Sequence, residues 1–168
     1  VDYPEFDLAD PALVSKRPWR DYETIINAAA YTNVNGAETA DGRTKAWAIN
    51  VSSLATLSKI ATENHLTLVH VSSDYVFDGS SNRPYRENDP VCPLGVYGQT
   101  KAAGDQIVAT VPRHYIVRTS WVIGDGPNFV RSMLDLVQSE TSPSVVSDQY
   151  GRLTFTSDLA LAIRHLLE

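Results

Sequence analysis

Two hydrophobic patterns take turns along the chain. Short, nearly continuous apolar runs occupy residues 23–27, 66–72 and 114–120, and such continuity is typical of strands that are buried in a parallel sheet. Elsewhere, from 41 to 64 and from 128 to 140, apolar residues recur every three or four positions, as on one face of a helix. This alternation predicts the α/β class, with a doubly wound parallel sheet.

Local signals mark where several of these elements begin. Asp10 is a suitable helix N-cap, and Pro11 suits the first helical position. Asn128 is expected to cap the helix that runs through residue 140, and a final amphipathic helix is expected from 156 to 167. A last short strand is predicted at 144–147. The 128–140 helix carries an apolar stripe that we expect in the core: Phe129, Met133, Leu134 and Val137.

The candidate chemistry lies in residues 96–101, read together with the end of the strand at 66–72. On a helix, Tyr97 and Lys101 are four positions apart and share one face. A phenol titrates near pH ~10, so a tyrosine that moves protons at neutral pH needs a cation that favours its phenolate, and Lys101 is a candidate. Ser73 follows the apolar strand, at the carboxyl edge where α/β enzymes bind ligands. Its hydroxyl is placed to hold a substrate carbonyl. The alternative is an amphipathic tyrosine beside a solvated lysine, a pair that many helices contain by chance.

Other polar and small residues fit a ligand cleft or ordinary structure equally well. Asp7 and Leu8 precede the first helix on a loop, and the small residues 28–30 after a strand allow either a close ligand or tight packing. Asn50 lies among apolar neighbours, either facing solvent or hydrogen-bonded inside a cleft. His70, within the 66–72 strand, is expected to be a hydrogen-bonded core histidine rather than a metal ligand.

Composition narrows the function classes. The chain has 168 residues, which we interpret as one domain, residues 1–168, and its net charge of −6 argues against a general nucleic-acid binder. Cys92 is the only cysteine, so no intrachain disulfide is expected. No apolar stretch approaches the roughly 20 residues that span a bilayer, and a cytoplasmic location with no membrane partner is expected. Four scattered histidines and one cysteine give no metal-ligand spacing, so no metal is expected.

Six motifs in order give the chain a specific resemblance. Together they resemble the dTDP-4-dehydrorhamnose reductases, within the extended short-chain dehydrogenase/reductase superfamily, over essentially the whole chain. The motifs are Asn27-Ala28-Ala29-Ala30-Tyr31-Thr32-Asn33-Val34, Ser73-Asp74-Tyr75-Val76-Phe77, Val96-Tyr97-Gly98-Gln99-Thr100-Lys101, Arg118-Thr119-Ser120-Trp121-Val122, Asn128-Phe129 and Asp148-Gln149-Tyr150-Gly151.

This resemblance implies a function and a role for each matched residue. The family reduces the C4 ketone of dTDP-4-dehydro-β-L-rhamnose with NADPH or NADH, giving dTDP-L-rhamnose for cell-surface polysaccharide. Tyr97 would be the general acid, Lys101 would hold the nicotinamide ribose and lower the Tyr97 pKa, and Ser73 would hydrogen-bond the ketone. The implied substrate contacts are Ser73, Asp74, Tyr75, Trp121 and Val34. The implied cofactor contacts are Asp7, Leu8, Ala30, Tyr31, Thr32, Asn50, Tyr97 and Lys101. The resemblance is also compatible with a homodimer.

The sequence departs from the family at both ends. Such Rossmann-type reductases begin with a strand, a G-x-x-G-x-x-G turn and a helix that binds the pyrophosphate, and no segment here matches that unit. The C-terminal substrate lobe is also cut short. We therefore expect a fragment that carries the catalytic residues but binds cofactor poorly, if at all, and in which the strand around Ile25 has an unpaired edge.

Two rival functions stay open. One is a nucleotide-sugar epimerase or dehydratase of the same superfamily, for which Asp74 would be the acidic residue beside the strand-end hydroxyl. The other is a non-catalytic regulatory module, such as the regulatory subunit of methionine adenosyltransferase, which resembles the same reductases. The complete set of Ser73, Tyr97 and Lys101 favours the reductase over both.

Overall fold

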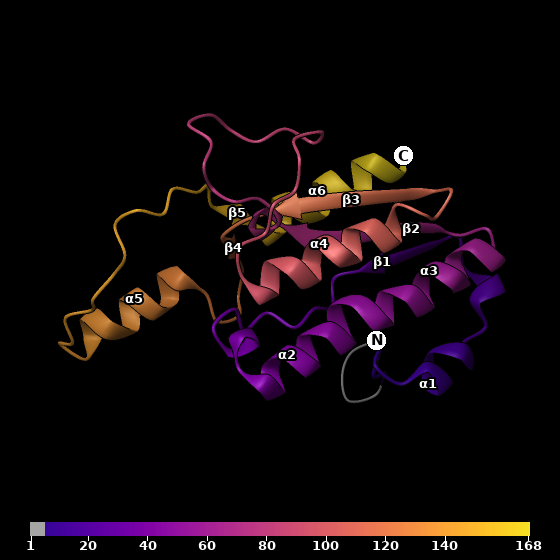
Figure 1. Ribbon diagram of the computed structural model, residues 1–168, viewed down its shortest axis with the longest axis horizontal. Helices are drawn as coiled ribbons and strands as arrows, with labels where there is room; N and C mark the ends of the chain where they lie inside the picture. The colour runs from indigo at the N-terminus through magenta and orange to yellow at the C-terminus, as the bar shows by residue number, and fades with distance from the viewer. Residues whose placement is uncertain (1–5) are drawn as a thin grey trace. The chain divides into compact units, whose positions relative to one another are not determined.

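The computed structural model describes residues 6–168 (Figure 1). The chain, expected as one partial domain, divides into two compact units, one that ends at Arg118 and one from Thr119 to Glu168. None of the helices within residues 6–168 is both long and apolar enough to cross a bilayer.

The first unit alternates helices and strands as predicted. Asp10 caps its first helix by accepting hydrogen bonds from the backbone of Ala12 and Leu13, with Pro11 at the first helical position. Its elements, in chain order, are α1 (Pro11–Ser15), η1 (Trp19–Asp21), β1 (Thr24–Asn27), η2 (Gly36–Glu38), α2 (Ala40–Trp47), η3 (Ala48–Ser52), α3 (Ser53–Glu63), β2 (Thr67–Ser73), η4 (Asp74–Val76), α4 (Val96–Val108) and β3 (His114–Thr119).

The sheet of the first unit has the order β1-β2-β3, and β1 pairs with β2 in parallel, from Thr24 beside Thr67 to Asn27 beside His70. Helices α3 and α4 lie side by side along this sheet (Figure 1). Their apolar residues meet those of the strands in one core that includes Leu54 and Leu57 of α3, Leu68 of β2 and Val108 of α4. The α/β class is confirmed. Within residues 6–168, β1 has no second neighbour, as expected for the strand around Ile25.

One detail of β1 differs from the prediction. Its burial alternates, with Ile25 8% and Asn27 5% exposed but Ile26 53% exposed, so the strand is covered on one face only. Strand β2, by contrast, is nearly buried throughout. The apolar run of β1 matches a strand buried on both faces, and the described residues supply only one of the two covering layers.

The long predicted helix at 41–64 forms, but not as one regular helix. Between α2 and α3 it passes through η3, a single π-helical turn that holds Asn50. Gly104 of α4 lies directly against this turn: a Cβ at Gly104 would be 2.6 Å from the Asn50 carbonyl oxygen. Such wide turns are frequent at functional sites, and this one brings the backbones of η3 and α4 together.

The second unit contains β4 (Val122–Ile123), α5 (Phe129–Gln138), β5 (Thr154–Phe155) and α6 (Thr156–Leu167), with β4 and β5 paired in parallel. Asn128 caps α5 by accepting a hydrogen bond from Arg131 N at 3.1 Å, as predicted. The last helix also forms over the predicted residues.

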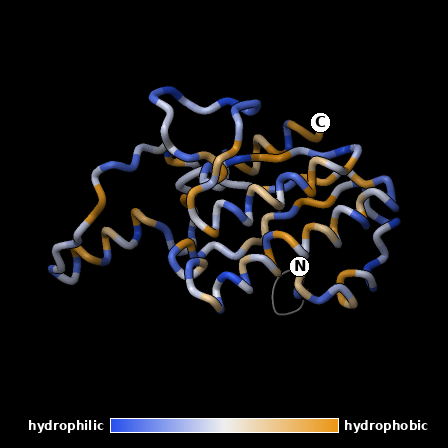
Figure 2. Tube along the Cα trace, in the orientation of Figure 1, coloured by the Kyte–Doolittle hydropathy of each residue, from blue (hydrophilic) through white to orange (hydrophobic). Residues whose placement is uncertain are grey.

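Two predictions for the second unit were wrong. Residues 144–147 form no strand; the strand pairing occurs instead at β5, because Thr154 lies beside Val122 of β4. The stripe on α5 is not core: Phe129 is 49%, Leu134 56% and Val137 72% exposed. Figure 2 shows hydrophobic and polar residues alternating along this helix. The predicted helix forms, but the described residues supply no surface that covers its apolar stripe.

Candidate active site

Strand β2 and helix α4 bring the three predicted catalytic residues into one region. Ser73 is the last residue of β2, and Tyr97 and Lys101 lie one turn apart on α4. Tyr97 is 9% and Lys101 1% exposed, so the lysine is not a solvated surface residue. The Ser73 hydroxyl donates to Asp74 Oδ1 at 3.2 Å and accepts from Tyr75 N at 3.2 Å. The ring of Tyr75 packs edge-on against that of Tyr97, with 5.6 Å between the centroids.

The start of α4 is held by a residue that the sequence analysis did not identify. Gly95, the N-cap position, has no side chain to accept a hydrogen bond from the first turn. Glu38 of η2 supplies the acceptor, since its Oε1 receives the Val96 N–H at 2.8 Å across 58 residues of sequence. A carboxylate is also favoured at the positive end of a helix. The signal in the sequence was the absence of a capping side chain before Val96.

Gly98 places the first turn of α4 directly against η4. A Cβ at Gly98 would be 2.2 Å from the Tyr75 carbonyl oxygen, so any side chain there forces α4 away from the backbone that follows Ser73. We expect Gly98→Ala to lower the free energy of unfolding by about 1–3 kcal/mol, measured by urea unfolding with circular dichroism. On an exposed face of a helix, Gly→Ala stabilises the fold by about 1 kcal/mol. The sign of the change in unfolding free energy therefore shows whether the close contact is present.

Gly126→Ala is the matched control, because nothing lies within 4 Å of a Cβ at that position. A Gly98→Ala variant as stable as wild type would contradict the close contact between α4 and η4.

The electrostatics of Tyr97 differ from the prediction. Burial raises the pKa of Tyr97, the nearby Ser73 hydroxyl opposes this, and the negative charge of Asp74 adds to it. Lys101 does not contribute to this shift; its Nζ donates to the Val71 carbonyl at 2.8 Å and lies 3.2 Å from His70 Nε2. That part of the prediction was wrong. The phenol therefore keeps its proton at neutral pH.

Lys101 is itself strongly perturbed. Burial lowers its pKa to about 8, with the nearby Asp105 carboxylate opposing the change. A lysine with such a pKa exchanges its proton close to neutral pH, which suits a site that transfers protons.

Asn50 cross-links the loop after β1 to α4. Its Oδ1 accepts from Tyr31 N at 2.8 Å, and its Nδ2 donates to Tyr31 O at 3.2 Å and to Thr100 Oγ1 at 3.0 Å. Both amide hydrogens are thus used within the protein, and the residue is 2% exposed. Asn50 therefore positions the loop, in place of the direct cofactor contact that the resemblance implied.

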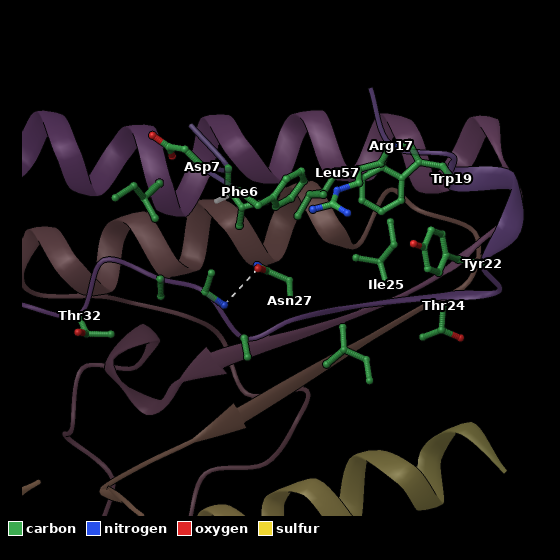
Figure 3. Close-up of a pocket in the computed structure, with 16 residues that line it drawn as sticks. Phe6, Asp7, Arg17, Trp19, Tyr22, Thr24, Ile25, Asn27, Thr32 and Leu57 are labelled. Carbon is green, nitrogen blue, oxygen red and sulfur yellow. Dashed lines mark hydrogen bonds between the residues drawn. The ribbon is translucent and has the colours of Figure 1, made fainter. Parts of the chain in front are cut away.

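A hollow of about 770 Å³ lies along β1 and the loop that follows it (Figure 3). Four of the predicted cofactor residues line it: Asp7, Leu8, Ala30 and Thr32. Tyr31 and Asn50 are not among the lining residues. Much of the remaining lining is apolar, including Phe6, Trp19, Ile25 and Leu57. The hollow thus combines the predicted cofactor loop with the residues of β1 from Thr24 to Asn27.

The predicted substrate residues are divided between the two units. Asp74 accepts a hydrogen bond from Ser73 Oγ at 3.2 Å, and burial raises its pKa. Val34 packs on the small cluster that contains Tyr97, and Tyr75 is 42% exposed beside it. Trp121 belongs to the second unit, where its ring packs against Phe129 with 5.9 Å between the centroids.

His70 is the hydrogen-bonded core histidine that the sequence predicted. It is 1% exposed, and burial together with the charge of Lys101 lowers its pKa to about 3. Because the unfolded chain takes up this proton near pH 6.5 and the folded chain does not, His70 contributes stability that is present above pH 6.5 and is lost as the pH falls toward 3. We expect the free energy of unfolding to fall by about 1.4 kcal/mol per pH unit in this window from this residue alone.

Urea unfolding between pH 4 and 7 tests this expectation, with His70→Gln as the variant that cannot titrate. The slope of the unfolding free energy against pH should be shallower in His70→Gln by about the same amount. Equal slopes for the two proteins would show that His70 does not carry the acid sensitivity.

Comparison with known proteins places these residues in context. The family model described as the RmlD substrate binding domain matches residues 1–168. A dTDP-4-dehydrorhamnose reductase of Aggregatibacter actinomycetemcomitans is 38% identical over 175 residues, covering 100% of this chain and 58% of the relative. The chain thus spans little more than half the length of that curated relative.

Solved structures that are similar to this chain include reductases of the same description. A dTDP-4-dehydrorhamnose reductase of Clostridium acetobutylicum superimposes with a TM-score of 0.92 at 36% identity, covering 99% of this chain and 60% of that one. The enzyme of the same description from Bacillus anthracis, in complex with NADP, superimposes with a TM-score of 0.88 at 32% identity, covering 99% and 59% of the two chains.

Proposed function

The chain belongs to the family of RmlD substrate binding domains, and from this premise we propose that it carries the acid–base residues of a nucleotide-sugar ketone reductase. The proposed reaction reduces the C4 ketone of dTDP-4-dehydro-β-L-rhamnose to the alcohol of dTDP-L-rhamnose. The observation that supports it most strongly is the buried group of Ser73, Tyr97 and Lys101 at the carboxyl end of β2. The complete set favours a catalytic role over a regulatory one.

The proposed cofactor is NADPH or NADH, and the residues present fit part of it. Ala28, Ala29 and Ala30 line the hollow beside β1, and their small side chains allow a planar ligand to approach the backbone. Asp7, Leu8 and Thr32 line the same hollow. We assign the adenine end to Asp7 and Leu8, and the nicotinamide ribose to Lys101, with the ring of Tyr97 beside it. No G-x-x-G-x-x-G turn occurs in the sequence, so no residue is assigned to the pyrophosphate.

Tyr97 is proposed as the general acid. When bound, the nicotinamide supplies the hydride to C4. Because burial raises the pKa of Tyr97, the phenol is protonated at neutral pH and is able to donate that proton to the C4 oxygen. Lys101, one helical turn along α4, is proposed to hold the nicotinamide ribose beside it.

Ser73 is proposed to hold the same oxygen through a hydrogen bond. Its hydroxyl now donates to Asp74 Oδ1 at 3.2 Å and accepts from Tyr75 N at 3.2 Å. Rotation of the Ser73 hydroxyl hydrogen from Asp74 to a substrate oxygen keeps the Tyr75 contact. Ser73 thus orients the ketone while Tyr97 donates the proton.

The proposal extends to the setting of the reaction. We expect a cytoplasmic enzyme, for which the single, exposed and unpaired Cys92 is suitable. A homodimer stays a prediction, and sedimentation velocity is the measurement that tests it.

A chimera tests the function. Residues 1–168 replace the matching segment of the Clostridium acetobutylicum relative, whose remaining segments supply the rest of that protein. We expect NADPH oxidation, followed at 340 nm, that depends on dTDP-4-dehydro-β-L-rhamnose. A folded chimera that binds NADPH and leaves this ketone unreduced would overturn the proposal.

A further inference from the structure

A line of buried polar side chains connects the three strands of the first unit beneath Lys101. From β1, the Asn27 side-chain nitrogen lies 3.1 Å from His70 Nδ1 on β2, and His70 Nε2 lies 3.2 Å from Lys101 Nζ on α4. Asp105, one turn further along α4, lies 3.9 Å from His70 Nε2 through Oδ1 and accepts from Arg118 Nε of β3 at 3.0 Å through Oδ2. Asn27, His70, Lys101 and Asp105 are each 5% exposed or less.

Two contacts fix the direction of the lysine side chain. An ammonium group has three hydrogens to donate. One is donated to the Val71 carbonyl at 2.8 Å, and His70 Nε2 lies 3.2 Å from the same Nζ. With two of the three directions fixed by β2, the third is fixed as well, and it is the one left for a ligand or for Tyr97.

The imidazole is suited to this contact in either charge state of the lysine. Because His70 is buried beside a cation, it stays neutral and its ring offers one donor and one acceptor nitrogen. A charged Lys101 donates to Nε2, with the ring hydrogen on Nδ1 facing the Asn27 amide oxygen. An uncharged Lys101 accepts from Nε2–H, with Nδ1 accepting from the Asn27 amide nitrogen. The amide of Asn27 serves the second arrangement as it stands, and the first by a rotation that gives up the contact of its Oδ1 with Ala29 N at 3.3 Å.

We propose that His70 is a positioning residue for Lys101, which it holds through Nε2 while Asn27 engages its other ring nitrogen. The importance of His70 for the reaction rests on the function proposed above. The hydrogen bonds of His70 do not depend on that function. His70 acts through Lys101 and touches neither substrate nor cofactor. Replacing it leaves Lys101 anchored by the Val71 carbonyl alone, free to rotate about that single contact.

The other ionisable groups near α4 do not supply the same contact. Asp105 pairs with Arg118 of β3, Asp74 of η4 acts on Tyr97, and Glu38 of η2 is engaged by the Val96 N–H. The charged residues of α2 and α3, which also pack against α4, are exposed: Asp41, Arg43, Lys45, Lys59 and Glu63. Within residues 6–168, His70 is thus the side chain found in hydrogen-bonding distance of Lys101 Nζ.

Titration of the lysine side chains by NMR, with 13Cε-labelled lysine in the 168-residue chain, tests the proposal directly. The exposed Lys45 acts as an internal reference, because its hydrogen bond to Asp41 raises its pKa whereas burial lowers that of Lys101. In His70→Leu we expect the pKa of Lys101 to fall by about 1, since a hydrogen bond to a charged group is roughly twice as strong as one between neutral groups.

Two conservative variants separate positioning from packing. A glutamine amide reaches the place of Nε2, so His70→Gln should restore the Lys101 pKa to the wild-type value. An asparagine amide reaches only the place of Nδ1, so His70→Asn should behave like His70→Leu. If all three variants fold and leave the Lys101 pKa unchanged, or if Gln and Leu shift it equally, the proposal is overturned.

The unmodified chain gives an independent readout that needs no variant. The 15N signals of Nδ1 and Nε2 differ strongly between the two neutral forms of the ring, so we expect them to change with the same midpoint as Lys101, although His70 itself stays uncharged. Ring signals that stay constant through the Lys101 titration would contradict the contact. Neither readout involves turnover, so failure of the reductase assay and failure of this proposal are separate results.

Discussion

In the chimera, Tyr97→Phe is expected to reduce turnover by about 100- to 10,000-fold, the usual contribution of proton transfer by a positioned side chain. The affinity for NADPH, measured by fluorescence titration, should change little. The reason is that the substitution removes the phenol oxygen but keeps the ring, which packs against Tyr75 and in the cluster with Val96.

Tyr115→Phe is the matched control. Tyr115 is 39% exposed on β3, and the same oxygen is removed there from a side chain with no role in the proposed reaction. Its turnover should equal that of wild type. If Tyr97→Phe also turned over at nearly the wild-type rate, Tyr97 would not be the general acid.

Arg118→Leu is expected to lower the free energy of unfolding by about 3–5 kcal/mol at pH 7, the usual cost of removing one partner from a buried ion pair. Asp105, which is 1% exposed, would lose the guanidinium that now donates to its Oδ2 at 3.0 Å. Burial already raises the pKa of Asp105. A group with a raised pKa stabilises the folded state at low pH and loses that contribution as the pH rises, so the deficit of the variant should grow from pH 4 to pH 7.

An exposed ion pair in the same unit provides the comparison. Arg83 binds both carboxylate oxygens of Asp89, at 2.8 and 2.9 Å, but its side chain is 56% exposed. Arg83→Leu should therefore leave the free energy of unfolding nearly unchanged. Equal losses for Arg83→Leu and Arg118→Leu, measured by urea unfolding, would contradict the importance assigned to burial at Asp105.

The parts of the fold that depend on neighbouring residues were predictable from the sequence. Asp10 and Asn128 cap their helices because a cap acts over two or three residues, and the spacing of Tyr97 and Lys101 follows from the helix repeat. The strand containing His70 was recognised from its apolar run. The resemblance to a reductase family rests on six such local motifs, and the family membership is confirmed.

The parts that depend on distant residues were not predictable in this way. Glu38 reaches the helix at Val96 across 58 residues, and Asn50 joins Tyr31 to Thr100 across 19 and 50 residues. No local pattern records such contacts. The apolar stripe of α5 is a second example, because helical spacing predicts which face of a helix is apolar but not which residues cover that face.

The electrostatics of the site required the structure as well. The sequence places a cation one helical turn from Tyr97, and from this a lowered phenol pKa was expected. The structure instead turns Lys101 to Val71 and His70, and burial dominates at Tyr97. Spacing on a helix thus predicted which residues meet, but not which of several partners each side chain selects.

The central claim is that Ser73, Tyr97 and Lys101 perform the proton transfer of a nucleotide-sugar ketone reduction. Its most direct test is a single-turnover experiment on the chimera, with dTDP-4-dehydro-β-L-rhamnose and NADPH that carries deuterium at the transferred position. The account predicts deuterium at C4 of the sugar by mass spectrometry, and at least about a 100-fold slower appearance of label in Tyr97→Phe. A chimera that binds both ligands and transfers no deuterium to C4, or transfers it equally fast without the Tyr97 hydroxyl, would contradict it.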